Sequence, residues 1–216
     1  MQDKTRSKLK LAFLLLIAFV PITLATFAFR AATESGAFTS TVNKGNLISP
    51  PADITDLQML DPGGQPLFRS FEAVVAALEN DDDYQVQPWL MVYVNNGECE
   101  SACRQRVHLL RQMHITLNKN SPRVRRYYLH AGDGSLTETT AAHFREEFPS
   151  MGIAFGSARD IESNLAAKNL ALDLGEDDYV FFVDPVGNVM MYFTSEHSIE
   201  EIKSDLERLL KYSSLG

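Results

Sequence analysis

The feature that most constrains the fold is a pair of cysteines placed directly after an apolar run. Cys99 and Cys103, the only two cysteines of the chain, follow residues 89–94, Trp-Leu-Met-Val-Tyr-Val. That run is typical of a buried strand, and apolar residues recur at helical spacing from Cys103 onward. The pair is therefore expected where a strand gives way to a helix. Thiols in such a place bind soft metals or exchange electrons, and we expect both sulfurs to be accessible at the mouth of the fold.

The rest of the chain reads as an alternation of strands and helices. From Trp89 the predicted order is β-α-β-α-α-β-β-α, which is the order of a thioredoxin-like domain. We therefore predict an α/β fold with a central mixed sheet flanked by helices, an N-terminal hairpin extension and a single N-terminal transmembrane helix. The turn of the hairpin is Asp61-Pro-Gly-Gly64, and Ser198-Ile-Glu-Glu201 is a capping box that opens the last helix. Strands are expected over residues 90–94, 123–129, 179–183 and 189–193, and helices from Phe71 and over residues 103–117, 137–148, 157–172 and 198–209.

The first thirty residues predict a membrane anchor. Residues 11–29 are nineteen residues without a charge, close to the ~20 that cross a bilayer. Four basic residues precede this run and only Arg30 follows at once, so the N-terminus is expected in the cytoplasm. This gives a cytoplasmic tail (1–10), an anchor (11–30), a linker (31–52) and a thioredoxin-like domain (53–216). We expect a single-pass protein of the bacterial inner membrane with its C-terminal domain in the periplasm.

A cleaved signal peptide is the alternative for this segment. The apolar region of a signal peptide usually spans about 7–15 residues and ends at a small-x-small site. The run here is longer, and Ser35-Gly-Ala37 is a weak match to such a site.

Charge excludes one class of partner. The whole chain carries −8 and residues 1–30 carry +4, so residues 31–216 carry −12. A domain this acidic repels phosphate backbones, and we expect no nucleic-acid partner.

The spacing of the cysteines favours a pair that opens and closes. In a regular helix, side chains at i and i+4 stand about 5–6 Å apart at Cβ, whereas a relaxed disulfide needs about 3.8 Å. Two such thiolates suit a bridging Cu(I), and they can oxidise when the first turn of the helix opens. The other reading is a permanent disulfide outside the cytoplasm, although its short loop would add little chain-entropy stabilisation. A zinc site is not expected, because no further Cys or His pair completes four ligands.

Four segments together resemble the Sco/SenC family. They are Gln58-Met-Leu-Asp-Pro-Gly-Gly-Gln-Pro, the strand 89–94, Cys99-Glu-Ser-Ala-Cys103 and Val183-Asp-Pro-Val-Gly-Asn. The resemblance covers residues 45–212 and implies a membrane-anchored, thioredoxin-like protein that serves copper-site assembly in cytochrome c oxidase. Cys-x-x-x-Cys-Arg-Gln with a downstream Leu-Arg-Gln further resembles a divergent bacterial branch associated with oxidase biogenesis. The family would also place Asp184-Pro185 near the site.

This chain departs from the family pattern at its copper ligands. The family has a proline after its cysteines, where this chain has Glu100 and Arg104, and its histidine ligand falls on Glu176. We take His130 as the best substitute ligand, because strand ends meet at the same sheet edge as the cysteine loop. Glu176 or Asp177 could offer only oxygen, a hard ligand better suited to Cu(II).

Three functions follow for Cys99 and Cys103. The pair is predicted to act in oxidase assembly by thiol–disulfide exchange, with Cys99 attacking and Cys103 resolving, or by delivering Cu(I) with His130 as a third ligand. The expected partners are the copper-site subunit of cytochrome c oxidase or another assembly factor, with membrane lipid around the N-terminal helix. The third function is a scaffold protein of oxidase biogenesis whose cysteine pair is vestigial or structural.

Overall fold

The computed structural model of the chain divides into two compact units, Met1–Val42 and Asn43–Gly216. It describes residues 2–34, 42–57, 59–69, 71–80, 87–132 and 134–213. Residues 35–41 of the predicted linker, which include the weak cleavage site, lie outside the described residues.

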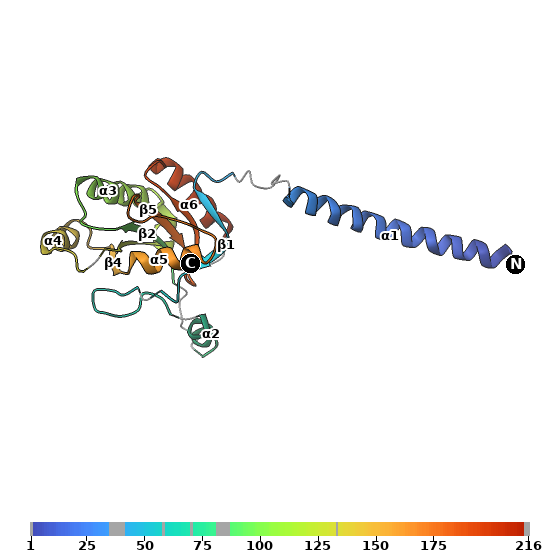
Figure 1. The fold of residues 1–216 in the computed structure, drawn as a ribbon, viewed down its shortest axis with the longest axis horizontal. Helices are drawn as coiled ribbons and strands as arrows, with labels where there is room; N and C mark the ends of the chain where they lie inside the picture. Colours follow the sequence, from blue (N-terminus) through green and yellow to red (C-terminus); the bar gives the residue numbers. More distant parts are fainter. Residues whose placement is uncertain are drawn as a thin grey trace. The chain divides into compact units, whose positions relative to one another are not determined.

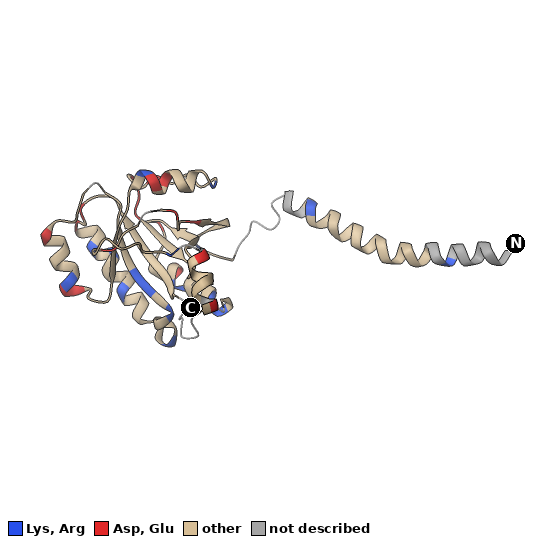
Figure 2. Ribbon diagram, turned by 90° about the horizontal axis from the view of Figure 1, so that it is seen from below, with Lys and Arg blue, Asp and Glu red and all other residues tan. Residues whose placement is uncertain are grey.

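The first unit contains α1 (Gln2–Glu34), and its stretch Phe13–Ala31 is long and apolar enough to cross a membrane by length and composition. In the sequence, Lys10 precedes this stretch and Arg30 lies at its end, and Figure 2 shows the described part of the helix between its two blue positions in tan, without a charged residue. Within the stretch, the hydroxyl of Thr26 donates to the carbonyl of Ile22 at 2.8 Å. Polar atoms on the apolar run are thus satisfied by the helix itself, as a lipid environment requires.

The second unit is built on one six-stranded sheet in the described part of the chain, ordered β1-β6-β5-β2-β3-β4. The strand pairs β2–β3 and β3–β4 are parallel, and the other pairs are antiparallel. The strands are β1 (Asn46–Asp53), β2 (Trp89–Asn95), β3 (Val124–His130), β4 (Gly152–Phe155), β5 (Tyr179–Val183) and β6 (Asn188–Phe193). The remaining elements are α2 (Phe71–Asn80), α3 (Ser101–Ile115), a 3-10 turn (Asn118–Arg123), α4 (Glu138–Glu147), α5 (Ala158–Ala166) and α6 (Ile199–Tyr212).

Helices cover both faces of the sheet (Figure 1). Each face has its own apolar core. One core joins β2, β3, β5 and β6 to α3, α4 and α6, and both cysteines belong to it. The other core joins the opposite face to α5, β1 and the segment around Met59. The central strands β2 and β5 are buried along their whole length because both faces are covered. This mixed sheet confirms the predicted thioredoxin-like fold.

The N-terminal extension forms the predicted turn. The amide of Gly64 donates to the carbonyl of Asp61 at 2.9 Å, and Leu60 pairs with both Pro66 and Phe155. The extension therefore lies along β4, which ends the sheet on that side. Gln58, which belongs to the predicted hairpin, lies outside the described residues.

Two strands and one helix end differ from the sequence prediction. β4 has four residues and begins with a glycine, so it is too short to show a period of two. β1 lies in the segment predicted as linker, because its Pro50 and Pro51 read as a loop. Both prolines fall where the β1–β6 register shifts, between Leu47 and Ala52. α5 stops at Ala166 rather than at residue 172.

Asp205 of α6 ties the beginning of the second unit to its last helix. Its buried carboxylate accepts the backbone N–H groups of Lys44 at 2.6 Å and Gly45 at 2.8 Å. The other carboxylate oxygen has no hydrogen-bond partner in the described structure. An amide at this position would lose the charge-assisted bonds and bury an NH2 group without an acceptor.

We expect Asp205→Asn to lower the free energy of unfolding by about 1–2 kcal/mol. Urea unfolding of residues 43–216, followed by the fluorescence of Trp89, measures the change. Glu207→Gln on the same helix removes only an exposed ion pair with Lys203 and should have little effect. Equal stability of the Asp205→Asn variant and the wild type would contradict this role.

Candidate functional site: a disulfide at the end of the central strand

The cysteines lie where β2 ends and α3 begins, as the sequence predicts. Cys99 precedes the helix, whose N-cap is Glu100 in an extended conformation, and Cys103 lies in its first turn. The two are joined by a disulfide with Cα atoms 5.2 Å apart, within the usual range. The pair oxidises because Cys99 lies outside the regular helix, which removes the excess separation expected of a fully helical pair.

The expectation that both sulfurs are accessible is wrong for this disulfide form. Cys99 is 1% exposed and Cys103 is 4% exposed. The neighbouring residues Asn96, Glu98 and Glu100 are nevertheless exposed. The disulfide therefore lies just beneath the surface at the edge of the sheet, and a partner reaches it only after a local movement.

Glu98 fastens the start of α4 against the cysteine loop. Its carboxylate accepts hydrogen bonds from the hydroxyl groups of Thr137 and Thr140, both at 3.0 Å, and from the Thr137 N–H at 3.3 Å. These hydrogen bonds hold the pKa of Glu98 below its usual value, and the bond from the Thr137 hydroxyl has the largest effect. Leu136, just before this contact, belongs to the same apolar cluster as both cysteines. We call residues 136–140 the cover.

A buried polar network lies at the same edge of the sheet. Asp178, in the loop before β5, accepts hydrogen bonds from the Tyr93 hydroxyl at 2.6 Å and from the Asn95 side chain at 3.1 Å. The Tyr128 hydroxyl donates to the side-chain Oδ1 of Asn95 at 2.9 Å. Burial raises the pKa of both tyrosines, so both remain neutral donors. The network fixes the ends of β2, β3 and β5 around the point where the cysteine loop departs.

Two arginines of α3 hold the helix against the surrounding backbone. Arg104 donates through Nε to the carbonyl of Cys99 at 3.1 Å. Arg106 donates to the carbonyls of Thr194 and His197 at 3.1 and 3.0 Å, and burial lowers its pKa. The first contact stabilises the turn that contains the disulfide, and the second fixes α3 to the loop between β6 and α6.

His130 ends β3 and lies beside the cysteine loop. It is opposite Asn95 in the parallel register, it is 3% exposed, and its Nδ1 has no hydrogen-bond partner in the described structure. Its imidazole interacts with the backbone of Gly97 and the charge of Glu98. Among the described residues, however, no group of three or more His, Cys, Asp or Glu could hold a metal ion. The disulfide form thus does not fit a copper ion.

Burial of His130 predicts a pH-dependent stability. Burial lowers the pKa of this imidazole below its usual value, against smaller opposing effects of Glu98 and Gly97. The unfolded chain therefore binds more protons below about pH 6.5, and stability is lost as the pH falls from there to the folded pKa. We expect His130→Gln to reduce the loss of unfolding free energy between pH 7.5 and pH 5, measured by urea unfolding. The exposed His108→Gln is the control, and an unchanged pH dependence in His130→Gln would contradict the effect.

Other predicted residues lie elsewhere. Glu176 and Asp177 are exposed, and it is Asp178 that turns inward. Asp184 follows β5, whose Val183 pairs with Leu90 at the start of β2. The Asp184-Pro185 turn therefore lies at the end of β2 opposite the cysteines, not near them. Glu98 and the cover were not predicted from the sequence, in which the threonine N-cap at Thr137 is the one local signal of this contact.

A thioredoxin-like sheet with a disulfide at a strand–helix junction defines the class of protein. A family model described as "Transmembrane-like, thioredoxin-like, C-terminal domain" matches residues 89–213, more than half of the chain. The chain belongs to this family. No curated protein sequence matches it.

Solved structures with a similar fold include members of the Sco family. BsSco, a cytochrome c oxidase assembly protein described as containing a disulfide switch, is 12% identical with a TM-score of 0.51. The match covers 80% of this chain and 99% of that chain. Copper-bound ScoI of Arabidopsis thaliana is 13% identical with a TM-score of 0.45, over 59% of this chain and 87% of that chain. A thio-disulfide isomerase of Thermus thermophilus is 19% identical with a TM-score of 0.40, over 81% and 100%. At 12% identity, the similarity to BsSco shows the fold alone.

Proposed function

We propose that the protein is a membrane-anchored thiol–disulfide exchange factor for the assembly of cytochrome c oxidase. The observation that carries this proposal is the disulfide between Cys99 and Cys103 at the junction of β2 and α3. A disulfide that closes so short a loop adds little to folding stability, so a structural role explains it poorly. Its place at a sheet edge, under a cover held by one carboxylate, suits a bond that is opened and closed.

The exchange begins from the reduced pair. The Cys99 thiolate attacks one sulfur of a partner disulfide, forming a mixed disulfide and releasing one partner thiolate. The Cys103 thiolate then attacks the sulfur of Cys99, forming the Cys99–Cys103 disulfide and releasing the second partner thiolate. Two electrons pass to the partner, and the oxidised form described here is the product. A dithiol donor outside this chain must reduce it again.

The oxidase is the proposed target because of the residues that resemble the Sco/SenC family. The similar fold of BsSco, an oxidase assembly protein with a disulfide switch, also supports the oxidase as the target. The partner is then the copper-site subunit of the oxidase or another assembly factor. The apolar stretch Phe13–Ala31 and the preceding basic residues support a single-pass protein of the bacterial inner membrane with its second unit in the periplasm.

Delivery of Cu(I) is a second candidate, and His130 is the observation that favours it. Reduction would free two thiolates, and the unpartnered Nδ1 of His130 is a buried nitrogen beside the same loop. Titration of the reduced protein with Cu(I) separates the two candidates. Less than about half an equivalent of bound Cu(I), together with ready disulfide reduction, favours exchange over delivery.

Replacing both cysteines by serine tests the proposed function against the scaffold alternative. In host cells that lack the wild-type protein, we expect the double variant to give little or no mature cytochrome c oxidase. Oxidase activity of the membranes is the measurement, and Ser101→Ala, between the two cysteines, is the matched control. Normal oxidase activity with the double variant would favour the scaffold and overturn the exchange mechanism.

A further inference from the structure

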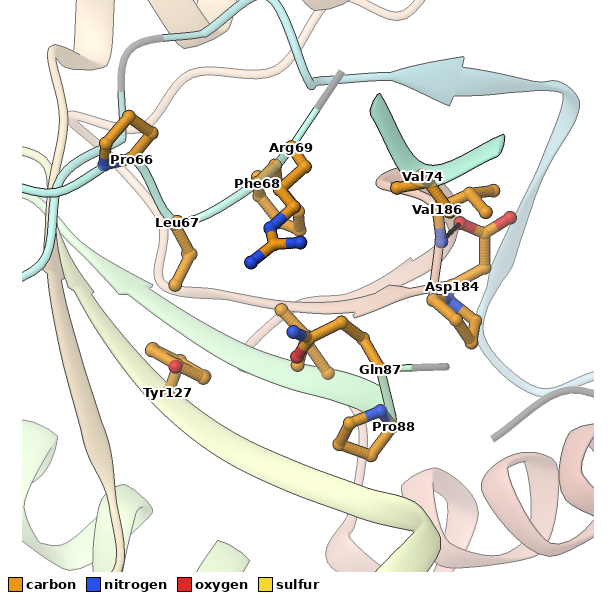
Figure 3. Close-up of a pocket in the computed structure, with 12 residues that line it drawn as sticks. Pro66, Leu67, Phe68, Arg69, Val74, Gln87, Pro88, Tyr127, Asp184 and Val186 are labelled. Atoms are coloured by element: carbon orange, nitrogen blue, oxygen red, sulfur yellow. Dashed lines mark hydrogen bonds between the residues drawn. The ribbon is translucent and has the colours of Figure 1, made fainter. Parts of the chain in front are cut away.

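A second cavity lies far from the disulfide, at the beginning of β2. Its volume is about 240 Å³. It is formed by the extension, α2, the first residues of β2, Tyr127 of β3 and the turn between β5 and β6 (Figure 3). Leu90 is one of its walls, whereas the cysteine loop begins after Asn95, roughly 17 Å away at the rise of a strand. The proposed exchange chemistry does not use this cavity.

Most of the side chains that line the cavity are apolar, although polar atoms make up most of the surface that it exposes. One glycine also allows an aromatic ring to stand in its wall. A Cβ at Gly152 would overlap the ring of Tyr127. Gly187 has a φ of +94°, and a Cβ there would lie 3.5 Å from the Phe68 ring and overlap Thr55. The backbone at Gly152 thus allows the Tyr127 ring to approach closely, whereas the Phe68 ring lies at ordinary contact distance. The other apolar lining residues are Pro66, Leu67, Val74, Pro88, Leu90, Pro185 and Val186.

Three hydrogen-bond donors of the cavity have no partner among the described residues, and two of them, Arg69 and Gln87, are exposed to solvent. Figure 3 shows the guanidinium of Arg69 and the amide of Gln87 pointing into the same space, with Tyr127 on its far side. The ion pairs of the described residues are Arg145–Glu138 and Lys203–Glu207, so Arg69 has no described carboxylate within salt-bridge distance. A cation left without a carboxylate is notable in a segment, residues 31–216, that carries −12.

The remaining charged group of the cavity is already satisfied. The carboxylate of Asp184 accepts from the N–H of Val186 at 3.0 Å and from the backbone and side chain of Asn188 at 2.8 and 2.9 Å. The cavity therefore offers donors and one positive charge, but no carboxylate that seeks a partner. A carboxylate carries up to four acceptor sites and matches an arginine fork.

We propose that this cavity binds a carboxylate attached to a short apolar body. The guanidinium of Arg69, assisted by Gln87 and Tyr127, would receive the carboxylate, and the apolar walls would receive the body. The volume of 240 Å³ equals about eight water molecules, so the ligand is small. Such a group is either a free organic acid or the C-terminal residue of a partner protein, and both present the same chemistry.

The probe is 3-phenylpropanoate, titrated by saturation-transfer NMR against the full chain in phosphatidylcholine nanodiscs. A ligand of about eleven non-hydrogen atoms should bind in the millimolar range, and empty nanodiscs give the background. We expect Arg69→Gln to weaken binding roughly tenfold, because the charged hydrogen bonds are lost. Replacing the probe by its neutral amide should do the same. Gln87→Leu, which keeps the side-chain size, should weaken it less.

Arg159→Gln is the matched control, since Arg159 is exposed, carries the same charge and lies outside the cavity. It should leave binding unchanged. A short peptide ending in phenylalanine, compared with its C-terminal amide, distinguishes the two sources. Tighter binding of the peptide acid than of 3-phenylpropanoate assigns a protein C-terminus, and weaker binding assigns a free acid. Absence of saturable binding, equal binding by Arg69→Gln, or equal binding of acid and amide overturns the site.

Discussion

Cells that produce the Cys103→Ser variant should accumulate the protein in a mixed disulfide with its partner, while the Cys99→Ser variant should give no such adduct. In the proposed exchange, Cys99 forms the bond to the partner and Cys103 breaks it. Without Cys103, the protein has no second thiolate to attack the mixed disulfide and release the partner. Acid quenching, alkylation and non-reducing electrophoresis detect the adduct, and mass spectrometry identifies the partner through its cross-linked cysteine.

The structure supports this order of attack through the positions of the two cysteines. Cys99 lies in the loop before α3, flanked by exposed residues, so a movement of the cover uncovers it first. Cys103 lies within the helix and is held there by its first turn. The double variant, which can form no adduct, is the background control. An adduct with Cys99→Ser and none with Cys103→Ser would reverse the assignment.

Glu98→Gln should make the disulfide react roughly tenfold faster with dithiothreitol than in the wild type. The carboxylate of Glu98 accepts three hydrogen bonds from the start of α4, and an amide cannot replace all of them. Because the sulfurs are buried, reduction requires the open form of the cover, and its population rises when the closed form is weakened. The rate is measured by trapping free thiols with a mass-shifting alkylating reagent during reduction.

Glu100→Gln is a closely matched control for this experiment. Glu100 is also adjacent to Cys99 and exposed, and its side chain makes no capping hydrogen bond. The two variants make the same charge change one residue from the same sulfur, so any electrostatic effect on the incoming thiolate is shared. Equal rates for Glu98→Gln and Glu100→Gln would show that Glu98 does not hold the cover closed.

Sequence patterns predicted the fold where they were long and periodic. The run 89–94 and the helix of Cys103 gave the β2–α3 junction, and the capping box at Ser198 gave the start of α6, where both of its reciprocal bonds form. β4 was not predicted because its four residues are too few to show a period of two. β1 was not predicted because its two prolines are typical of a loop. Their strand character comes from pairing with β3 and β6, which is tertiary information.

The candidate site was predictable in its chemistry but not in its accessibility. Two cysteines after a buried strand indicated a redox or metal pair from the residues alone. Leu136 belongs to the same apolar cluster as both buried cysteines, and the hydrogen bonds of Glu98 to Thr137 join residues nearly forty positions apart. No local pattern reports such a contact. Likewise, His130 could be placed at the sheet edge from topology, but its unpartnered nitrogen required the structure.

The most direct test of the account is the reduction potential of the Cys99–Cys103 couple, measured on the full chain in glutathione and dithiothreitol redox buffers. It distinguishes a disulfide that takes part in exchange from one that only crosslinks the fold. A working couple should titrate reversibly as a two-electron step above about −300 mV, since a bond that closes so small a ring gains little from chain entropy. A potential well below that value, with no detectable exchange at the potentials of glutathione, would identify a permanent crosslink and contradict the account.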